Sequence, residues 1–187
     1  MLERLLSEAA THDAGEPDRL RRWRVLEPDA GAFLSFLIRL TGARDAVEIG
    51  TSQGASTLVL ADALRATGGR LTSVDIDPGA GVHARARLTE AGLDDVVEFR
   101  TADGGADLAA RPDASLDLLF LDAERTQYAS WWPHPVRVLR PGGLLAVDNA
   151  HSHAGEIDPL ASLLGAEPGV HTVTVPVGKG ELLATRT

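Results

Sequence analysis

The stretch at residues 45–57, DAVEIGTSQGAST, constrains the fold of this 187-residue chain more than any other. A short apolar run carries Glu48 and ends at Gly50, and a small polar loop leads to Gly54, where a helical pattern begins. This order predicts a buried strand, a tight glycine turn, and a helix whose first N–H groups face the space beyond the strand. Such a turn often builds a nucleotide-type ligand site, although an ordinary Gly-rich turn of a doubly wound protein gives the same pattern.

The composition limits the class of protein. With 44% hydrophobic residues, the chain can bury the core of one globular domain. The net charge of -9 favours a small-molecule substrate over nucleic acid, and the absence of cysteine favours a cytoplasmic location. Apolar runs fall short of the ~18 residues of a membrane helix, and the N-terminus lacks a secretory signal. We expect one domain over residues 1–187, with a helical lid at 1–27 and a core at 28–187, that binds neither nucleic acid nor membrane.

From residue 45 onward, short apolar runs alternate with helical patterns. The patterns predict strands at 47–50, 71–76, 96–100, 116–121, 144–147, 170–175 and 181–185. They predict helices at 2–10, 18–26, 30–40, 56–66, 80–91, 106–110, 127–139 and 156–164. The Gly-Lys-Gly sequence at 178–180 is a hairpin signal that makes the last strand antiparallel to its neighbour. We therefore predict a doubly wound, Rossmann-like α/β fold with a seven-stranded, mostly parallel sheet, an antiparallel last strand and helices on both faces.

Polar residues follow four successive strands of this predicted sheet, at the edge where such sheets bind ligands: Asp75, Asp103, Asp122, and the pair Asp148 and Asn149. Each alone is explained by the frequency of Asp where a strand becomes a loop, but together they indicate a site. Asp75 lies 21 residues after Gly54, a spacing that suits hydrogen bonds to ribose hydroxyls. This spacing fits NAD as well as S-adenosylmethionine, but the G-x-G-x-x-G order of many dinucleotide sites is missing.

Several motifs resemble those of the class I S-adenosylmethionine-dependent methyltransferases. Within that class they are similar to the cation-dependent O-methyltransferases, which include the catechol and caffeoyl-CoA O-methyltransferases. VEIGTSQGAST resembles the first motif of the family, SVDIDP its ribose acid, FLDAERTQY its metal motif and LRPGGLLAVDNA its fifth-strand motif. The resemblance covers residues 27–150, and the antiparallel last strand also agrees with it.

The resemblance implies a site for S-adenosylmethionine at these strand ends. It places the methionine end against the first turn, the ribose against the acid after the second strand, and the adenine against the residues after the third strand. The implied cofactor residues are Glu48, Gly50, Gly54 and Ser56, then Asp75, then Ala102 and Asp103, with Thr51, Ser52 and Asp122 alongside. Without a ligand, the glycines would mark an ordinary turn and Ser56 a helix N-cap.

Asp122, Asp148 and Asn149 are the predicted metal ligands. The implied fold makes their strands neighbours, about 4.8 Å apart, so that both carboxylates and the amide oxygen can reach one ion. Such oxygen donors suit Mg²⁺, which would lower the pKa of an acceptor hydroxyl and hold its oxygen in line with the methyl group. A loop-capping Asp and an Asp-Asn turn are the alternative. We expect a Mg²⁺-dependent O-methyltransferase that acts on a small hydroxylated acceptor of the catechol or vicinal-diol type.

One position departs from the family, which usually has a lysine three residues after the first metal Asp, where this chain has Arg125. Arginine stays charged and cannot act as a base, but it can stabilise an oxyanion or bind an acidic group. His151 and His153 follow the metal pair and are candidate bases, since a neutral imidazole can accept a phenolic proton. Alternatively, one histidine is a fourth metal ligand, or all three residues face solvent.

Three rival functions stay open at this point. The chain could use S-adenosylmethionine without a metal, on an acceptor whose acid group Arg125 binds. It could bind S-adenosylmethionine without catalysis. An oxidoreductase that uses a nicotinamide cofactor is disfavoured because a Tyr-x-x-x-Lys pair is missing. A homodimer is a further expectation, and Trp23 and Arg24 are expected to reach the site from this chain or from a partner chain.

Overall fold

A single seven-stranded sheet forms the centre of the protein, in a computed structural model that describes residues 2–18, 23 and 25–187. The strand order is β3-β2-β1-β4-β5-β7-β6. The strands are β1 (Asp45–Ile49), β2 (Arg70–Asp75), β3 (Val97–Thr101), β4 (Leu116–Leu121), β5 (Leu139–Val147), β6 (Val170–Val175) and β7 (Glu181–Arg186). The first five strands pair in parallel, and β7 runs antiparallel to both β5 and β6. The predicted fold class is therefore confirmed.

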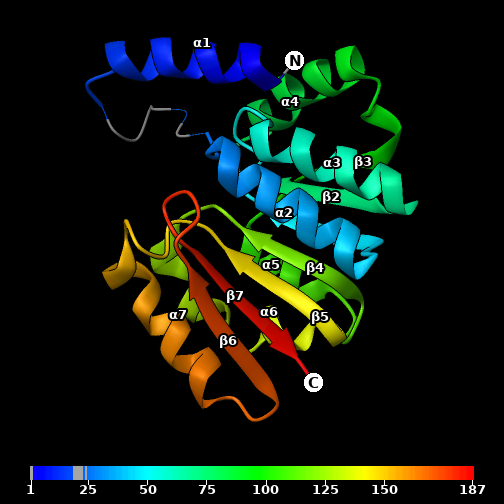
Figure 1. Ribbon diagram of the computed structural model, residues 1–187, viewed down its shortest axis with the longest axis vertical. Helices are drawn as coiled ribbons and strands as arrows, with labels where there is room; N and C mark the ends of the chain where they lie inside the picture. The colour runs from blue at the N-terminus through cyan, green and yellow to red at the C-terminus, as the bar shows by residue number, and fades with distance from the viewer. Residues whose placement is uncertain (1, 19–22, 24) are drawn as a thin grey trace.

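Helices cover both faces of the sheet (Figure 1). They are α1 (Leu2–Gly15), α2 (Pro28–Thr41), α3 (Ala55–Thr67), α4 (Pro78–Ala91), α5 (Gly104–Ala110), α6 (His134–Arg137) and α7 (Ala154–Ala166), with short 3-10 helices η1 (Asp94–Val96) and η2 (Arg125–Trp131). In Figure 1, α1 lies at the top of the view, away from the sheet. Its Arg4 forms an ion pair with Glu90 of α4. In the described part of the chain, each helix is too short or too polar to span a lipid bilayer.

Two predicted helices differ from the structure. Of the helix predicted at 18–26, the described residues 18, 23, 25 and 26 are not helical, and the others lie outside the described residues. The helix predicted at 127–139 is replaced by η2, the short α6 and the first residue of β5. Pro133 and Pro135 explain this break, because proline has no backbone N–H and restricts the residue before it. The division into a lid and a core stays a prediction.

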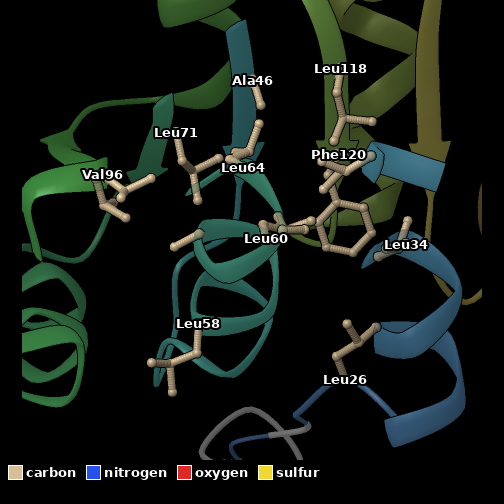
Figure 2. Packing of buried hydrophobic residues seen from close by; sticks show 14 of the residues in the cluster. Leu26, Leu34, Ala46, Leu58, Leu60, Leu64, Leu71, Val96, Leu118 and Phe120 are labelled. Carbon is tan, nitrogen blue, oxygen red and sulfur yellow. The ribbon is translucent and has the colours of Figure 1, made fainter. Parts of the chain in front are cut away.

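Strand β4 shows why the sheet is rigid. Its residues Leu118 and Phe120 are buried on one face against α2 and α3, and Leu119 and Leu121 are buried on the other face. Figure 2 shows the ring of Phe120 between the side chains of Leu34 and Leu60. Burial of one such side chain contributes roughly 1.5–3 kcal/mol, so the strand and the residue that follows it, Asp122, have a fixed position.

Candidate active site

The first turn is shaped by close backbone contacts. Gly50 has a φ of 110°, and a Cβ atom on it would stand 2.2 Å from the carbonyl oxygen of Asp122. Gly54 has a φ of 82°, and a Cβ atom there would stand 2.7 Å from the Cβ atom of Ala84 in α4. Any residue other than glycine would clash at both positions. The turn therefore lies close against the ends of β1 and β4 and the middle of α4.

Asp75, at the end of β2, holds this turn in place. Its Oδ2 atom accepts hydrogen bonds from the backbone N–H groups of Thr51 at 3.0 Å and Ser52 at 2.9 Å. Its Oδ1 atom accepts from the N–H of Asp77 at 2.9 Å. The hydroxyl of Thr51 is buried and lies 2.6 Å from that of Ser73. Asp75 and Ser52 also line the two pockets described below, so the predicted ribose acid faces open space.

Glu48 lies beneath the turn, outside the lining of both pockets. It is fully buried, and its Oε2 atom accepts hydrogen bonds of 2.6 Å from Thr57 and 2.6 Å from Ser73. Burial raises the pKa of Glu48 to about 7, against the effect of hydrogen bonds from Ser56 and these two hydroxyls. The structure thus places Glu48 and Ser56 behind the backbone of the turn, where they support it, rather than among the pocket-lining residues.

Two pockets meet above the carboxyl ends of the strands. The smaller has a volume of about 390 Å³ and extends over β1, β2 and the start of α5, where Gly50, Ala102, Asp103 and Trp131 line it. The larger has a volume of about 760 Å³ and extends toward α1, where it is lined by Asp13, Trp23, Glu27, His153 and Lys179. Both pockets are lined by Ser52, Asp75, Asp122, Ala123 and Arg125. A ligand could therefore occupy both at once.

The predicted cofactor residues of the smaller pocket also stabilise the fold. Asp103 caps α5, because its Oδ1 atom accepts a hydrogen bond of 2.8 Å from the N–H of Ala106.

Trp23 reaches the larger pocket, as expected, and its ring stacks on His12 with centroids 4.6 Å apart. Arg24 lies outside the described residues.

Asp122, Asp148 and Asn149 come together near the junction of the pockets: Asp122 lines both, Asn149 lines the larger, and Asp148 is buried beside them. The Nδ2 atom of Asn149 lies 3.4 Å from Oδ1 of Asp122 and 2.8 Å from Oδ2 of Asp148. Asn149 has a φ of 70°, a left-handed conformation that is uncommon outside glycine and often marks functional sites. The structure therefore places the three predicted metal ligands in one cluster.

The electrostatics of this cluster favour a cation. Burial and then the charge of Asp148 raise the pKa of Asp122 well above its usual value, while Lys179 and Arg125 lower it. Burial also raises the pKa of Asp148. Among the described residues, no group of three or more His, Asp or Glu side chains is arranged to hold a metal ion. The cluster instead offers two carboxylates and one amide, a donor set that fits Mg²⁺ when the amide presents its oxygen and water or substrate completes the coordination.

Glu181, at the start of β7, is a buried carboxylate that the sequence analysis missed. Burial, followed by the charge of Asp148, raises the pKa of Glu181 to about 9. The pairing of Val147 with Leu182 brings Glu181 beside Asp148. The only sign of it in the sequence was an acidic residue at the start of an apolar strand. That acid becomes part of the site only because β7 is the neighbour of β5.

The three predicted catalytic residues occupy different positions. Arg125 lines both pockets, and its Nε atom donates a hydrogen bond of 2.7 Å to Oε2 of Glu156 in α7. His153 lines the larger pocket, with its Nδ1 atom 2.9 Å from the hydroxyl of Ser152. His151 is exposed and does not line the pocket. Its predicted catalytic role stays a prediction, and the structure favours His153 of the two histidines.

The fold is that of known methyltransferases. An O-methyltransferase from Bacillus cereus, in complex with S-adenosylhomocysteine, is 26% identical with a TM-score of 0.80, and the match covers 100% of this chain and 90% of that chain. TomG from Streptomyces achromogenes, an O-methyltransferase of tomaymycin synthesis in complex with S-adenosylmethionine, is 28% identical with a TM-score of 0.78, and the match covers 97% of this chain and 89% of that chain. Both share the arrangement of nearly the whole chain.

Sequence comparison defines the family. The O-methyltransferase family profile matches residues 18–187. A Mycolicibacterium smegmatis protein that bears an O-methyltransferase name is 35% identical over 176 residues, which cover 87% of this chain and 83% of that protein. This chain therefore belongs to the O-methyltransferase family. The predicted resemblance and the predicted class of enzyme are confirmed.

Proposed function

We propose that this chain is a Mg²⁺-dependent O-methyltransferase that transfers a methyl group from S-adenosylmethionine to a hydroxyl of a small catechol-like or vicinal-diol acceptor. The observation that carries the proposal is the cluster of Asp122, Asp148 and Asn149 at the junction of the two pockets. The cofactors bound by the Bacillus cereus enzyme and by TomG support S-adenosylmethionine as the methyl donor.

The smaller pocket suits the cofactor. Asp75 faces it with a carboxylate that can accept hydrogen bonds from ribose hydroxyls, and Ala102 and Asp103 lie next to the space for the adenine. Gly50 lines this pocket, so its backbone can contact the methionine part. The sulfonium methyl would then lie toward Asp122, where the larger pocket begins.

Asp122, Asp148 and Asn149 would hold the Mg²⁺ ion. When bound, the ion supplies Lewis-acid chemistry that lowers the pKa of the acceptor hydroxyl. The two carboxylates, whose pKa values are raised by burial, would hold their negative charge more easily with a cation bound. The amide of Asn149, which donates from Nδ2 to both carboxylates in this structure, would turn its oxygen toward the ion.

Arg125 and His153 act on the acceptor side. The guanidinium of Arg125 is held by Glu156 and can bind negative charge on the acceptor, but it cannot accept the proton. His153 can accept the phenolic proton near neutral pH and pass it to water. Because methyl transfer is a displacement, orientation of the acceptor oxygen supplies most of the acceleration.

A catechol assay tests this function. The purified protein is incubated with S-adenosylmethionine and a panel of catechols, with Mg²⁺, with EDTA, and with Mg²⁺ restored after EDTA. We expect methylated product in the first and third conditions. Turnover that persists in EDTA would support the metal-independent alternative. Binding of S-adenosylhomocysteine without turnover on the panel would support a binding protein.

The proposal includes a cytoplasmic homodimer. The absence of cysteine agrees with the location. Phe36 and Leu40 of α2 are 59% and 68% exposed, and they offer an apolar surface to a second copy. Light scattering at micromolar concentration measures the mass directly, and the mass of a single chain would contradict the dimer.

A further inference from the structure

The hairpin between β6 and β7 is fixed on two sides. On one side, the N–H of Gly178 donates a hydrogen bond of 3.0 Å to Oδ2 of Asp29 at the start of α2. On the other side, the carbonyl oxygen of Lys179 accepts hydrogen bonds from the N–H groups of His151 at 2.9 Å and Ser152 at 3.0 Å. The backbone of Lys179 is thus clamped between α2 and the loop that follows Asn149.

The side chain of Lys179 enters the larger pocket, which Asp122, Asn149 and His153 also line. Its backbone is bonded to the loop that follows Asn149, so the side chain shares this pocket with two of the proposed metal ligands. The side chain is 39% exposed. A ligand in this pocket can therefore reach it.

The partner of Lys179 can be exchanged. Its ammonium group forms an ion pair with Oε1 of Glu27, just before α2. The Oε2 atom of Glu27 is buried and has no hydrogen-bond partner among the residues that the structure describes. The ammonium group is partly exposed and carries three donor hydrogens, so an anionic ligand atom can bind it beside the carboxylate or in its place.

Arg125, the other cation of the pocket, is less available. Its Nε atom is bonded to Glu156, and its side chain is 12% exposed. Lys179 carries three donor hydrogens on a long flexible stem and has more room to reorient. Of the two cations, Lys179 is the better placed to follow an acceptor into the pocket.

We propose that Lys179 contacts the acceptor and donates a charge-assisted hydrogen bond to the oxygen that receives the methyl group. This inference rests on the proposed function and adds a catalytic residue to it. The acceptor hydroxyl gives its proton to His153, and Lys179 stabilises the resulting anion. The oxygen then forms a bond to the methyl carbon while the carbon–sulfur bond breaks. The electron pair of that bond stays on sulfur, so S-adenosylhomocysteine and a neutral ether result.

Lys179 is the only lysine of the chain, which makes it a selective reporter. Its acetylation by an amine-selective reagent is followed by peptide mass spectrometry, with a lysine-containing reference peptide in the same tube as control. With S-adenosylhomocysteine and Mg²⁺ present, 3,5-dinitrocatechol at ten times its dissociation constant should slow acetylation of Lys179 by about 10-fold. The reference peptide should react at an unchanged rate.

Three variants complete the test. Lys179→Met should lower kcat/KM for catechol by about 100-fold, the typical effect of removing one donor to a reacting oxygen. Lys179→Arg keeps the charge and should recover at least a tenth of the wild-type value. Arg39→Met removes an exposed cation that pairs with Asp62 on the outside of α2, and it should leave kcat/KM unchanged.

The outcomes separate this inference from the proposed function. One outcome contradicts the role of Lys179 alone: the wild-type protein methylates catechol, Lys179→Met is equally active, and dinitrocatechol does not protect Lys179 from acetylation. In that case the proposed function stands. If the wild-type protein neither methylates a catechol nor binds dinitrocatechol, the proposed function is itself contradicted. If Lys179→Met is unstable, the acetylation of the wild-type protein decides alone.

Discussion

Gly50 and Asp122 are in backbone contact, so close that a Cβ atom on Gly50 would stand 2.2 Å from the carbonyl oxygen of Asp122. The two residues directly follow the paired strands β1 and β4. The turn that lines the proposed cofactor pocket and the first proposed metal ligand therefore move as one unit. A change at either residue is expected to disturb the other.

Gly50→Ala should lower the free energy of unfolding by about 3 kcal/mol, because the new Cβ atom clashes and a φ of 110° is strained for alanine. Gly42→Ala is the matched control. Gly42 has a φ of 66° with nothing within 4 Å of an added Cβ atom, so it should lose only about 1 kcal/mol. Urea denaturation measures both. Equal losses would show that the contact with Asp122 has no energetic importance.

Asp148→Asn should weaken Mg²⁺ binding by about 100-fold or more, since changes even in the residues around metal ligands cost 10–100-fold. Calorimetric titration of Mg²⁺ in the presence of S-adenosylhomocysteine measures the affinity. Asp62→Asn makes the same chemical change on the exposed side of α3 and should bind Mg²⁺ like the wild type. An unchanged affinity in Asp148→Asn would refute the metal site.

Glu48 should make stability depend on pH. Its pKa is raised from 4.5 to about 7, so the folded protein retains the proton more strongly than the unfolded chain. The contribution of this group is fully present below pH 4.5 and is lost as the pH rises to about 7. The loss amounts to about 3 kcal/mol. Glu48→Gln cannot ionise, so urea denaturation from pH 5 to pH 8 should show a smaller decline in this variant. Parallel curves for both proteins would contradict the raised pKa.

His151 and His153 offer a test by the same substitution at two nearby positions. His153→Gln should lower kcat for catechol by about 100-fold, since removal of a general base typically costs at least that much. His151→Gln should keep the wild-type rate, because the side chain lies outside the pocket. Steady-state kinetics at pH 7.5 measures both variants. The prediction fails if His151→Gln is the slower enzyme.

Much of the fold was predictable because strand β4, LDLLFL, is apolar on both faces apart from Asp117, as suits a central parallel strand. The Gly-Lys-Gly hairpin was predictable for a similarly local reason. The break at Pro133 shows the limit of helical periodicity, because apolar spacing continued across a residue that cannot extend a helix.

The site was predictable where it depends on strand ends. Asp122, Asp148 and Asn149 follow adjacent strands, and the fold class alone brings them together. Glu181 and the side chain of Lys179 were not predictable in this way, because their positions depend on β7 lying between β5 and β6. That His153 lines the larger pocket and His151 does not depends on loop dihedral angles, for which the sequence carries no periodic signal.

The clamp on the hairpin joins opposite ends of the chain, since Gly178 and Asp29 are 149 positions apart. One wall of the larger pocket is thus shared between an early segment that contains Glu27 and a late segment that contains Lys179. The turn at Gly50 belongs to neither segment. In a chimaera with a relative, the two segments must be exchanged as a pair, because a single exchange would separate Gly178 from Asp29 and Lys179 from Glu27.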